Sequence, residues 1–194
     1  MSRLLDAVLA AAALVALWPL LLAGAIAVRL SSPGPVLFVQ WRLGREGRPF
    51  RLYKFRSMFQ DAPDHRNADG SAYSGEDDPR LTPLGRWLRR TSLDELPQLF
   101  NVLLGDMALV GPRPDLVDQL AYYTDEERAK LAVRPGLTGL AQISGRNNIS
   151  WPRRKALDVE YVERRSLGLD LAILWRTVPY VLLRKDINTA NPSH

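Results

Sequence analysis

The sequence predicts a helix-rich α/β fold with few short strands, attached to a membrane through its N-terminal segment. Three observations support this fold class: an uncharged apolar run from Ala7 to Val28, two short strand-like segments after it, and several helix-start signals further along. The chain has 194 residues, enough for one domain plus a membrane element. We therefore expect a membrane segment over residues 1–30 and a folded domain over residues 31–194.

The N-terminal apolar run is long enough to reach across a bilayer. Its 22 residues would form a helix of roughly 33 Å, about the thickness of the hydrocarbon layer. A cleaved signal peptide, a spanning anchor and a re-entrant hairpin are three interpretations of such a run. Pro19, near its middle, removes a backbone hydrogen bond, which a kinked helix tolerates only where neighbouring groups satisfy the freed carbonyl. Hydropathy alone favours a spanning helix. Arg3 before the run and Arg29 after it are compatible with both ends lying on one side of the membrane.

Two strands are expected directly after this segment. Residues 31–35, Ser-Ser-Pro-Gly-Pro, form a turn. Val36–Trp41 and Phe50–Phe55 are typical of short strands, joined by a basic, glycine-containing turn over Leu43–Pro49. Asp61–Pro79 is polar and rich in Asp, Gly and Ser, so we expect a surface loop there.

Helices are predicted for much of the remaining chain. Four segments carry start signals or helical periodicity: Leu84–Arg90, Leu96–Leu104, Thr124–Ala132 and Ser150–Arg165. Thr124 and Glu127 have the spacing of a capping box, and Ser150 followed by Pro152 is typical of a helix start. Pro135–Gly145 is punctuated by glycine and predicts an extended loop with short strand character.

The last apolar segment, Leu169–Leu183, predicts another helix. Its aromatic and basic residues suit an amphipathic helix at a membrane surface, extending over residues 169–185. An ordinary amphipathic core helix is the alternative interpretation.

The amino-acid composition limits the kinds of molecule and metal site that the protein is expected to use. The formal net charge of +5 suits nucleic acid, anionic lipid or phosphorylated substrates. Basic residues are scattered, no recognition-helix motif is present, and the apolar segment suggests a membrane, so no nucleic acid partner is expected. The absence of cysteine excludes disulfides and thiolate metal sites, and His65 and His194 form neither a metal site nor a catalytic triad.

The most informative stretch covers residues 91–114, TSLDELPQLFNVLLGDMALVGPRP. Its adjacent acids, Asp94 and Glu95, could act with nearby arginines in metal-assisted phosphoryl chemistry, because Mg²⁺ prefers carboxylates and phosphates prefer arginine. Arg113 lies between two prolines, which restrict its backbone and could fix its guanidinium for a phosphate. The alternative is structural: Ser92 and Glu95 fit a capping box, although Pro97 would then lie beyond the first helical turn.

Several motifs in one order over nearly the whole chain resemble the monotopic phosphoglycosyl transferases, bacterial sugar transferases that act on a polyprenol phosphate carrier. Besides the N-terminal segment, the motifs that carry this resemblance are Lys54–Met58, Thr91–Pro114, Arg134–Gly139, Ser144–Asn147 and Leu157–Val162. The chain is similar to the minimal, single-domain form of the family.

The resemblance implies a transferase with a covalent intermediate. A UDP-sugar would give its sugar 1-phosphate to undecaprenyl phosphate, and UMP would leave. Asp94 matches the family's nucleophile and Glu95 its partner. Both are candidate Mg²⁺ ligands, and the alternative role for Glu95 is to position the incoming lipid phosphate. The candidates for binding the phosphates and the UDP-sugar are Arg113, Arg146, Arg89 and Lys54. Asp158 is expected to serve a structural ion pair or cap.

The resemblance also implies a place in the cell and a donor. We expect the catalytic domain to lie on the cytoplasmic face of a bacterial inner membrane, in contact with its lipid, with a re-entrant helix broken at Pro19 and peripheral amphipathic helices. Residues 145–151 are most similar to members that use acetamido sugars such as UDP-diacetylbacillosamine; UDP-glucose or UDP-galactose is the alternative. A homodimer is a possible assembly.

A membrane-anchored scaffold that binds anionic lipid is the non-enzyme alternative. It explains the apolar segment and the positive charge, but it gives no role to the acid pair followed by Gly-Pro-Arg-Pro. Replacing Asp94 by Asn distinguishes the two, because an enzyme would lose turnover whereas a scaffold would keep its function.

Overall fold

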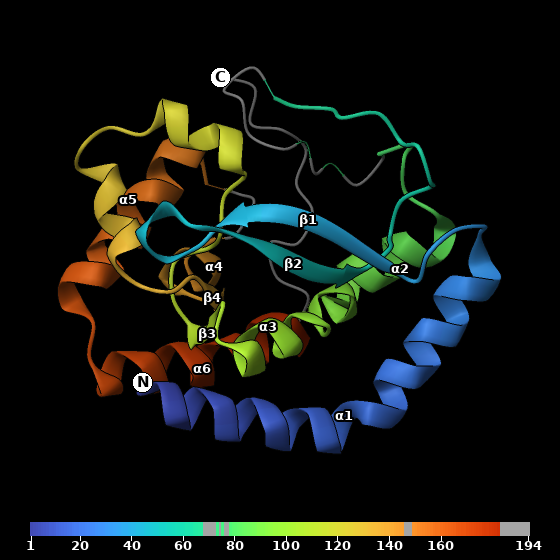
Figure 1. Ribbon diagram of the computed structural model, residues 1–194, viewed down its shortest axis with the longest axis horizontal. Coiled ribbons are helices and arrows are strands. Elements are labelled where there is room, and N and C mark those ends of the chain that lie inside the picture. The colour runs from blue at the N-terminus through green and yellow to red at the C-terminus, as the bar shows by residue number, and fades with distance from the viewer. Residues whose placement is uncertain (68–72, 74, 76–77, 146–148, 183–194) are drawn as a thin grey trace.

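A long N-terminal helix, α1 (Arg3–Ser31), runs along the base of the molecule and then turns up one side (Figure 1). The computed structural model describes residues 1–67, 73, 75, 78–145 and 149–182. Among them, α1 is the one helix long and apolar enough to cross a membrane. Pro19 lies inside it and leaves one carbonyl without its helical partner, which is the usual cause of a change in helix direction. The helix is continuous, and its re-entrant placement stays a prediction.

Two arginines attach α1 to the rest of the domain. Arg3, at its start, donates to the carbonyl oxygens of Val102 at 3.0 Å and Leu103 at 2.5 Å, at the end of α3 (Gln98–Leu104). Arg56 donates to the carbonyl oxygens of Val28 and Ser32 at the opposite end of α1, at 3.3 and 2.7 Å. These carbonyls lie at or near helix ends, where backbone acceptors lack some of their helical donors, and the two guanidinium groups supply further hydrogen bonds to them.

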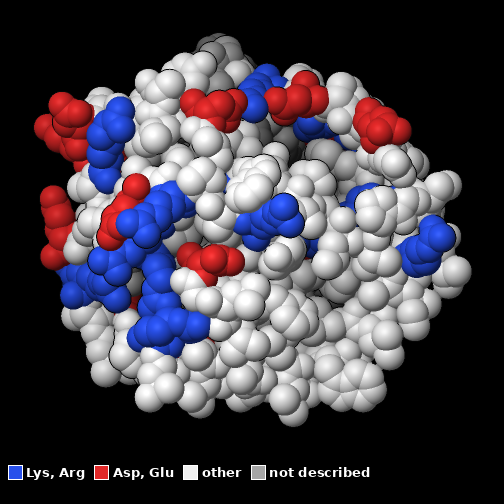
Figure 2. Space-filling view, in the orientation of Figure 1, with Lys and Arg blue, Asp and Glu red and all other residues white. Residues whose placement is uncertain are grey.

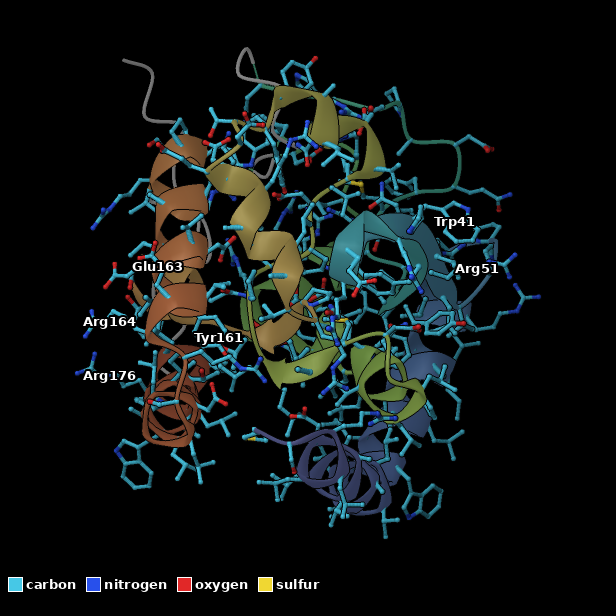
Figure 3. The ribbon with its side chains drawn as sticks, turned by 60° about the vertical axis from the view of Figure 1, so that its left-hand side comes forward. Trp41, Arg51, Tyr161, Glu163, Arg164 and Arg176 are labelled. Atoms are coloured by element: carbon cyan, nitrogen blue, oxygen red, sulfur yellow. The ribbon has the colours of Figure 1, made fainter. Side chains whose placement is uncertain are left out.

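The predicted strand pair is confirmed. Strands β1 (Leu37–Leu43) and β2 (Pro49–Phe55) form an antiparallel hairpin, joined through the short 3₁₀ helix η1 (Arg45–Gly47). On its outer face, Arg51 stacks over the ring of Trp41 at 5.3 Å (Figure 3). The opposite face, with Gln40 and Arg42, lines a cavity.

The predicted helix around residues 84–90 is confirmed as α2 (Pro83–Thr91), but the Ser92 capping box is wrong. Ser92 has a left-handed backbone, φ 56°, and its side chain makes no capping hydrogen bond to the turn that follows it. A separate 3₁₀ turn, η2 (Leu93–Glu95), follows it, and Pro97 stands at the N-cap of α3. Proline is costly inside a helix, so the chain breaks the expected helix into these two pieces.

A short parallel strand pair, β3 (Ala108–Val110) and β4 (Gly136–Thr138), lies under the hairpin. Strand character near residue 136 was expected, whereas β3 was not. The backbones approach very closely here: a Cβ on Gly136 would lie 2.0 Å from the amide nitrogen of Gly111. Glycine is therefore required for the pairing.

Three of the later helices, at residues 127–132, 151–164 and 167–182, agree with the predictions in position. The helix at residues 117–122 was not predicted, and the short helix at residues 140–143 replaces part of the extended loop expected there. The later helices are the 3₁₀ helices η3 (Val117–Tyr122) and η4 (Glu127–Ala132), and the α-helices α4 (Leu140–Ile143), α5 (Trp151–Arg164) and α6 (Leu167–Leu182). The capping box before η4 is confirmed, because Thr124 and Glu127 exchange hydrogen bonds at 3.0 and 3.2 Å. Ser150 caps α5 by accepting from the Arg153 amide.

Tyr161 ties the C-terminal helices to the core. It points inward from α5, while Glu163 and Arg164 point away (Figure 3). Its hydroxyl contacts the Val110 carbonyl of β3 at 3.2 Å and a carboxylate oxygen of Asp170 of α6 at 2.6 Å. Helices α5 and α6 are thereby held against the short parallel pair.

The base of the molecule is apolar. Exposed apolar side chains lie on α1, α3 and α6, and on α6 they include Leu171, Trp175 and Val178. Charged side chains in Figure 2 gather along the top and left of the visible face, and the lower right, where α1 runs, is uncharged. The predicted helix is present as α6, and it packs on the domain through Asp170 and Ile173, which are fully buried. Its contact with a membrane surface stays a prediction.

Candidate active site

A cavity of about 720 Å³ lies on the inner side of the β1–β2 hairpin, a volume suited to a nucleotide-sized ligand. Five predicted site residues from four parts of the chain line it: Lys54, Arg89, Asp94, Glu95 and Arg113. The sixth, Arg146, lies outside the described residues. The fold therefore brings the acid pair together with three cations that were singled out from sequence.

Glu95 joins two of these cations. One carboxylate oxygen, Oε1, accepts from Nζ of Lys54 at 2.8 Å and from a terminal nitrogen of Arg113 at 2.9 Å. Burial lowers the pKa of Lys54, although Glu95 opposes this, and Glu95 raises the pKa of Arg113. The side chain thought to close a capping box instead connects β2 to the Pro-Arg-Pro corner.

Asp94 is placed differently from its neighbour. It is 6 % exposed, and no described residue donates a hydrogen bond to its carboxylate. Burial raises the pKa of Asp94 to about 6; Lys54 opposes the rise and Glu95 adds to it. A buried carboxylate that ionises near neutral pH and is held only by nearby charges is suited to act as a nucleophile.

Arg89 reaches the cavity because α2 packs closely on residue 57. A Cβ on Gly85 would lie 1.8 Å from the Ser57 carbonyl oxygen, so only glycine allows this approach. Nε of Arg89 then donates to the Ser57 hydroxyl at 3.0 Å. Burial lowers the pKa of Arg89, and Asp94 opposes that shift. Its guanidinium is thus fixed on the side of the cavity near the nucleophile candidate.

The Pro-Arg-Pro corner follows β3 and is held by the strand pair. Gly136 donates its backbone N–H to the Pro112 carbonyl at 2.9 Å. Arg42 of β1 donates to the Pro114 carbonyl at 3.2 Å and to Gln40 at 2.6 Å. Burial lowers the pKa of Arg42 to about 10, and Arg113 adds to the effect. Arg42 was not selected from sequence, although its alternation with Gln40 along β1 could have indicated the cavity face.

A second charged cluster supports the corner from behind. Nζ of Lys130 lies 2.9 Å from Asp115 and 2.6 Å from Asp158, and Asp115 also accepts from the Tyr123 hydroxyl. Burial opposes the charge on Lys130, but Asp158 and Asp115 together raise its pKa. The expectation that Asp158 serves a structural ion pair is confirmed. Lys130 was missed because its partners lie 15 and 28 positions away in the chain.

The acid pair offers a limited set of metal ligands. Within the described residues there is no group of three or more His, Cys, Asp or Glu side chains that could hold a metal. Mg²⁺ usually takes one or two carboxylates together with substrate phosphates and water, so Asp94 and Glu95 fit that ion. Asp94 is the better placed of the two, because Glu95 already accepts from two cations.

Comparison with known proteins gives a consistent picture. The family model described as bacterial sugar transferase matches residues 1–184. The chain is 50% identical over 164 residues to the uncharacterized sugar transferase EpsL of Bacillus subtilis (strain 168), covering 84% of this chain and 78% of that protein.

Two further relatives have named activities. The UDP-glucose:undecaprenyl-phosphate glucose-1-phosphate transferase of Caulobacter vibrioides is 47% identical over 192 residues, which cover 93% of this chain and 69% of that protein. The undecaprenyl-phosphate galactose phosphotransferase of Salmonella typhimurium is 44% identical over 164 residues, covering 79% of this chain and 34% of that larger protein.

The position of Asp94 predicts a stability cost. Its pKa is raised from 3.8 to about 6, so ionised Asp94 destabilises the fold at neutral pH, and the cost disappears as pH falls through 6 towards 3.8. We expect Asp94→Asn to be about 1–3 kcal/mol more stable than wild type at pH 7.5 and equal near pH 4. Unfolding by denaturant at both pH values measures this. The control substitution Asp125→Asn, at an exposed residue, should leave the free energy of unfolding unchanged at both pH values. A variant Asp94→Asn that is less stable than wild type at pH 7.5 would contradict the prediction.

Proposed function

The chain belongs to the bacterial sugar transferase family, and we propose that it transfers a sugar 1-phosphate from a UDP-sugar to undecaprenyl phosphate. The products would be undecaprenyl-diphosphate sugar and UMP, as in the first membrane step of glycoconjugate assembly. One observation carries the proposal: the buried Asp94 carboxylate, with a pKa of about 6, lies among cations in a cavity of nucleotide size. The names of the relatives point to the same class of enzyme.

The reaction would proceed in two displacements at one phosphorus atom. A carboxylate oxygen of Asp94 attacks the phosphorus that carries the sugar, and the bond to the bridging oxygen breaks, so that UMP leaves with the electron pair. A phosphate oxygen of undecaprenyl phosphate then attacks the same phosphorus, and Asp94 leaves as a carboxylate. The soluble donor and the lipid acceptor can thus use one phosphate site in turn.

The cations that line the cavity would bind the phosphates of the substrate in this scheme, and each is held in place by a neighbouring side chain. Lys54 and Arg113 share Glu95, which keeps them oriented, and Arg89 is held by Ser57. Positioned cations of this kind stabilise the charge that develops on a transferring phosphoryl group. Asp94 and Glu95 would hold Mg²⁺, which supplies charge neutralisation of the diphosphate when bound.

Two classes of donor are candidates for this chain, a UDP-hexose and a UDP-acetamido sugar. The named relatives act on glucose or galactose, which favours a UDP-hexose for this chain. The expected acetamido sugar rests on residues 145–151, three of which lie outside the described residues. We therefore propose a UDP-hexose first and a UDP-acetamido sugar second.

The same scheme needs a membrane, and we place α1 in it as a re-entrant helix at the cytoplasmic face. The undecaprenyl chain is confined to the lipid, so the cavity must open near the bilayer. The apolar base formed by α1, α3 and α6 provides a surface for that contact. The bend at Pro19 and the arginines at both ends of α1 are compatible with entry and exit on one face.

Turnover is tested by UMP release from a panel of UDP-sugars, with undecaprenyl phosphate and Mg²⁺. We expect release with UDP-glucose or UDP-galactose, and loss of at least about 1,000-fold in Asp94→Asn, because the nucleophile is removed. The exposed Asp125→Asn serves as the matched control. If a folded wild type released no UMP from any donor, the scaffold alternative would replace the enzyme.

The pH dependence of kcat/KM should follow Asp94, which must be ionised to attack. We expect the rate to fall below about pH 6. In Lys54→Met the fall should move to higher pH, because a cation that lowers the pKa of Asp94 is lost; in Glu95→Gln it should move to lower pH, because a charge that raises it is lost. Profiles that shift in the same direction would argue against Asp94 as the titrating group.

The placement of α1 can be tested by cysteine labelling, since the chain has no native cysteine. Ser2→Cys and Ser31→Cys mark the two ends of the helix. We expect a membrane-impermeant maleimide to label both in inside-out vesicles and neither in right-side-out vesicles. A spanning helix would instead expose one end in each preparation, and that result would refute the re-entrant placement.

A further inference from the structure

One side chain in the cavity wall has polar atoms that the fold leaves without partners. Gln142 of α4 is 8 % exposed and lines the cavity, and neither its Nε2 nor its Oε1 has a hydrogen-bond partner among the described residues. Buried polar groups are nearly always hydrogen-bonded, so two orphaned atoms on one buried amide indicate a ligand.

The topology places Gln142 at the edge of the short sheet where the phosphate site is built. Strands β3 and β4 are parallel neighbours. The chain leaves β3 towards Arg113 and leaves β4 towards Gln142, so both residues follow the carboxyl ends of paired strands. Ligands of parallel sheets bind at such ends.

A glycine makes room for the amide at this position. A Cβ on Gly139 would lie 2.9 Å from Oε1 of Gln142 and 2.2 Å from the carbonyl oxygen of Gly111. Any side chain there would displace either the amide or the strand pair. The close packing of Gly139 on Gly111 thus sets the place of Gln142 relative to the corner that carries Arg113.

The hydrogen-bonding pattern of the Gln142 carboxamide matches one part of a nucleotide sugar, the uracil ring, better than an acetamido group. Gln142 offers one N–H donor and one C=O acceptor side by side. The uracil ring presents N3–H and C4=O side by side in the same way, so two parallel hydrogen bonds can form. An acetamido group has a trans amide, whose N–H and C=O point in opposite directions, and it cannot make both bonds to one carboxamide.

We propose that Gln142 reads the imide edge of the donor's uracil through two hydrogen bonds. The inference rests on the proposed use of a UDP-sugar and assigns the base-recognition site within it. Arg113 and its neighbours would hold the diphosphate, while Gln142 sets the nucleotide specificity from the adjacent strand end.

The test compares binding of UMP with binding of 3-methyluridine 5′-monophosphate, in which a methyl group blocks N3. Calorimetry on the full-length protein in detergent gives both Kd values. We expect wild type to bind UMP about 10- to 100-fold more tightly than the methylated nucleotide, which corresponds to the loss of two hydrogen bonds. In Gln142→Met the two Kd values should be nearly equal, and in the control Gln60→Met, an exposed glutamine at the cavity rim, the wild-type ratio should remain.

The outcomes distinguish failure of the proposed role of Gln142 from failure of the proposed transferase activity. Gln142→Glu, which keeps the shape and loses the donor, should also lose the preference, so the proposal remains testable if Gln142→Met fails to fold. An unchanged preference in a folded variant would overturn the role of Gln142 while UMP release in wild type still supported the transferase. A changed ratio between UDP-glucose and UDP-N-acetylglucosamine, with the uracil preference intact, would assign Gln142 to the sugar and also overturn the proposal.

Discussion

The arrangement of the site depends on one buried amide, Asn101 of α3. Its side-chain oxygen accepts from the Tyr53 amide at 3.0 Å and its nitrogen donates to the Arg51 carbonyl at 2.7 Å, so it takes the place of a neighbouring strand along β2. The side chain has no solvent exposure. Because Lys54 follows Tyr53 directly, and Glu95 lies just ahead of α3, this attachment sets the distance between the cation and the acid pair. Each such bond to a buried group contributes on the order of 1 kcal/mol.

The two acids of the pair are neutralised to different degrees, and this difference gives the site its chemistry. Glu95 accepts from two cations and acts as their support. Asp94 is buried without a hydrogen-bond donor among the described residues, so its ionised form is held at a cost to the fold. Proteins tolerate such costs where activity requires them. Gln142 is a second group of this kind, because its amide atoms are buried without hydrogen-bond partners in the described part of the chain.

The sequence predicted those parts of the molecule whose signals are local. The hairpin, α2, α5 and the capping box at Thr124 depend on nearby residues, and each was found as expected. The Ser92 capping box failed because Ser92 adopts a left-handed backbone and Pro97 separates η2 from α3. Strand β3 was missed because it is three residues long and pairs with a segment far along the chain. The same distance concealed Lys130, whereas Asp94, Glu95 and Arg113 were recognisable from their motif.

The decisive question is whether Asp94 carries the phosphosugar. Intact-protein mass spectrometry can answer it after mixing the enzyme with a UDP-hexose in the absence of undecaprenyl phosphate. A gain of one hexose phosphate, mapped to the peptide that contains Asp94 and lost when the lipid phosphate is added, is the expected result. Turnover without any adduct under these conditions, or an adduct that persists in Asp94→Asn, would contradict the assignment of Asp94 as the nucleophile.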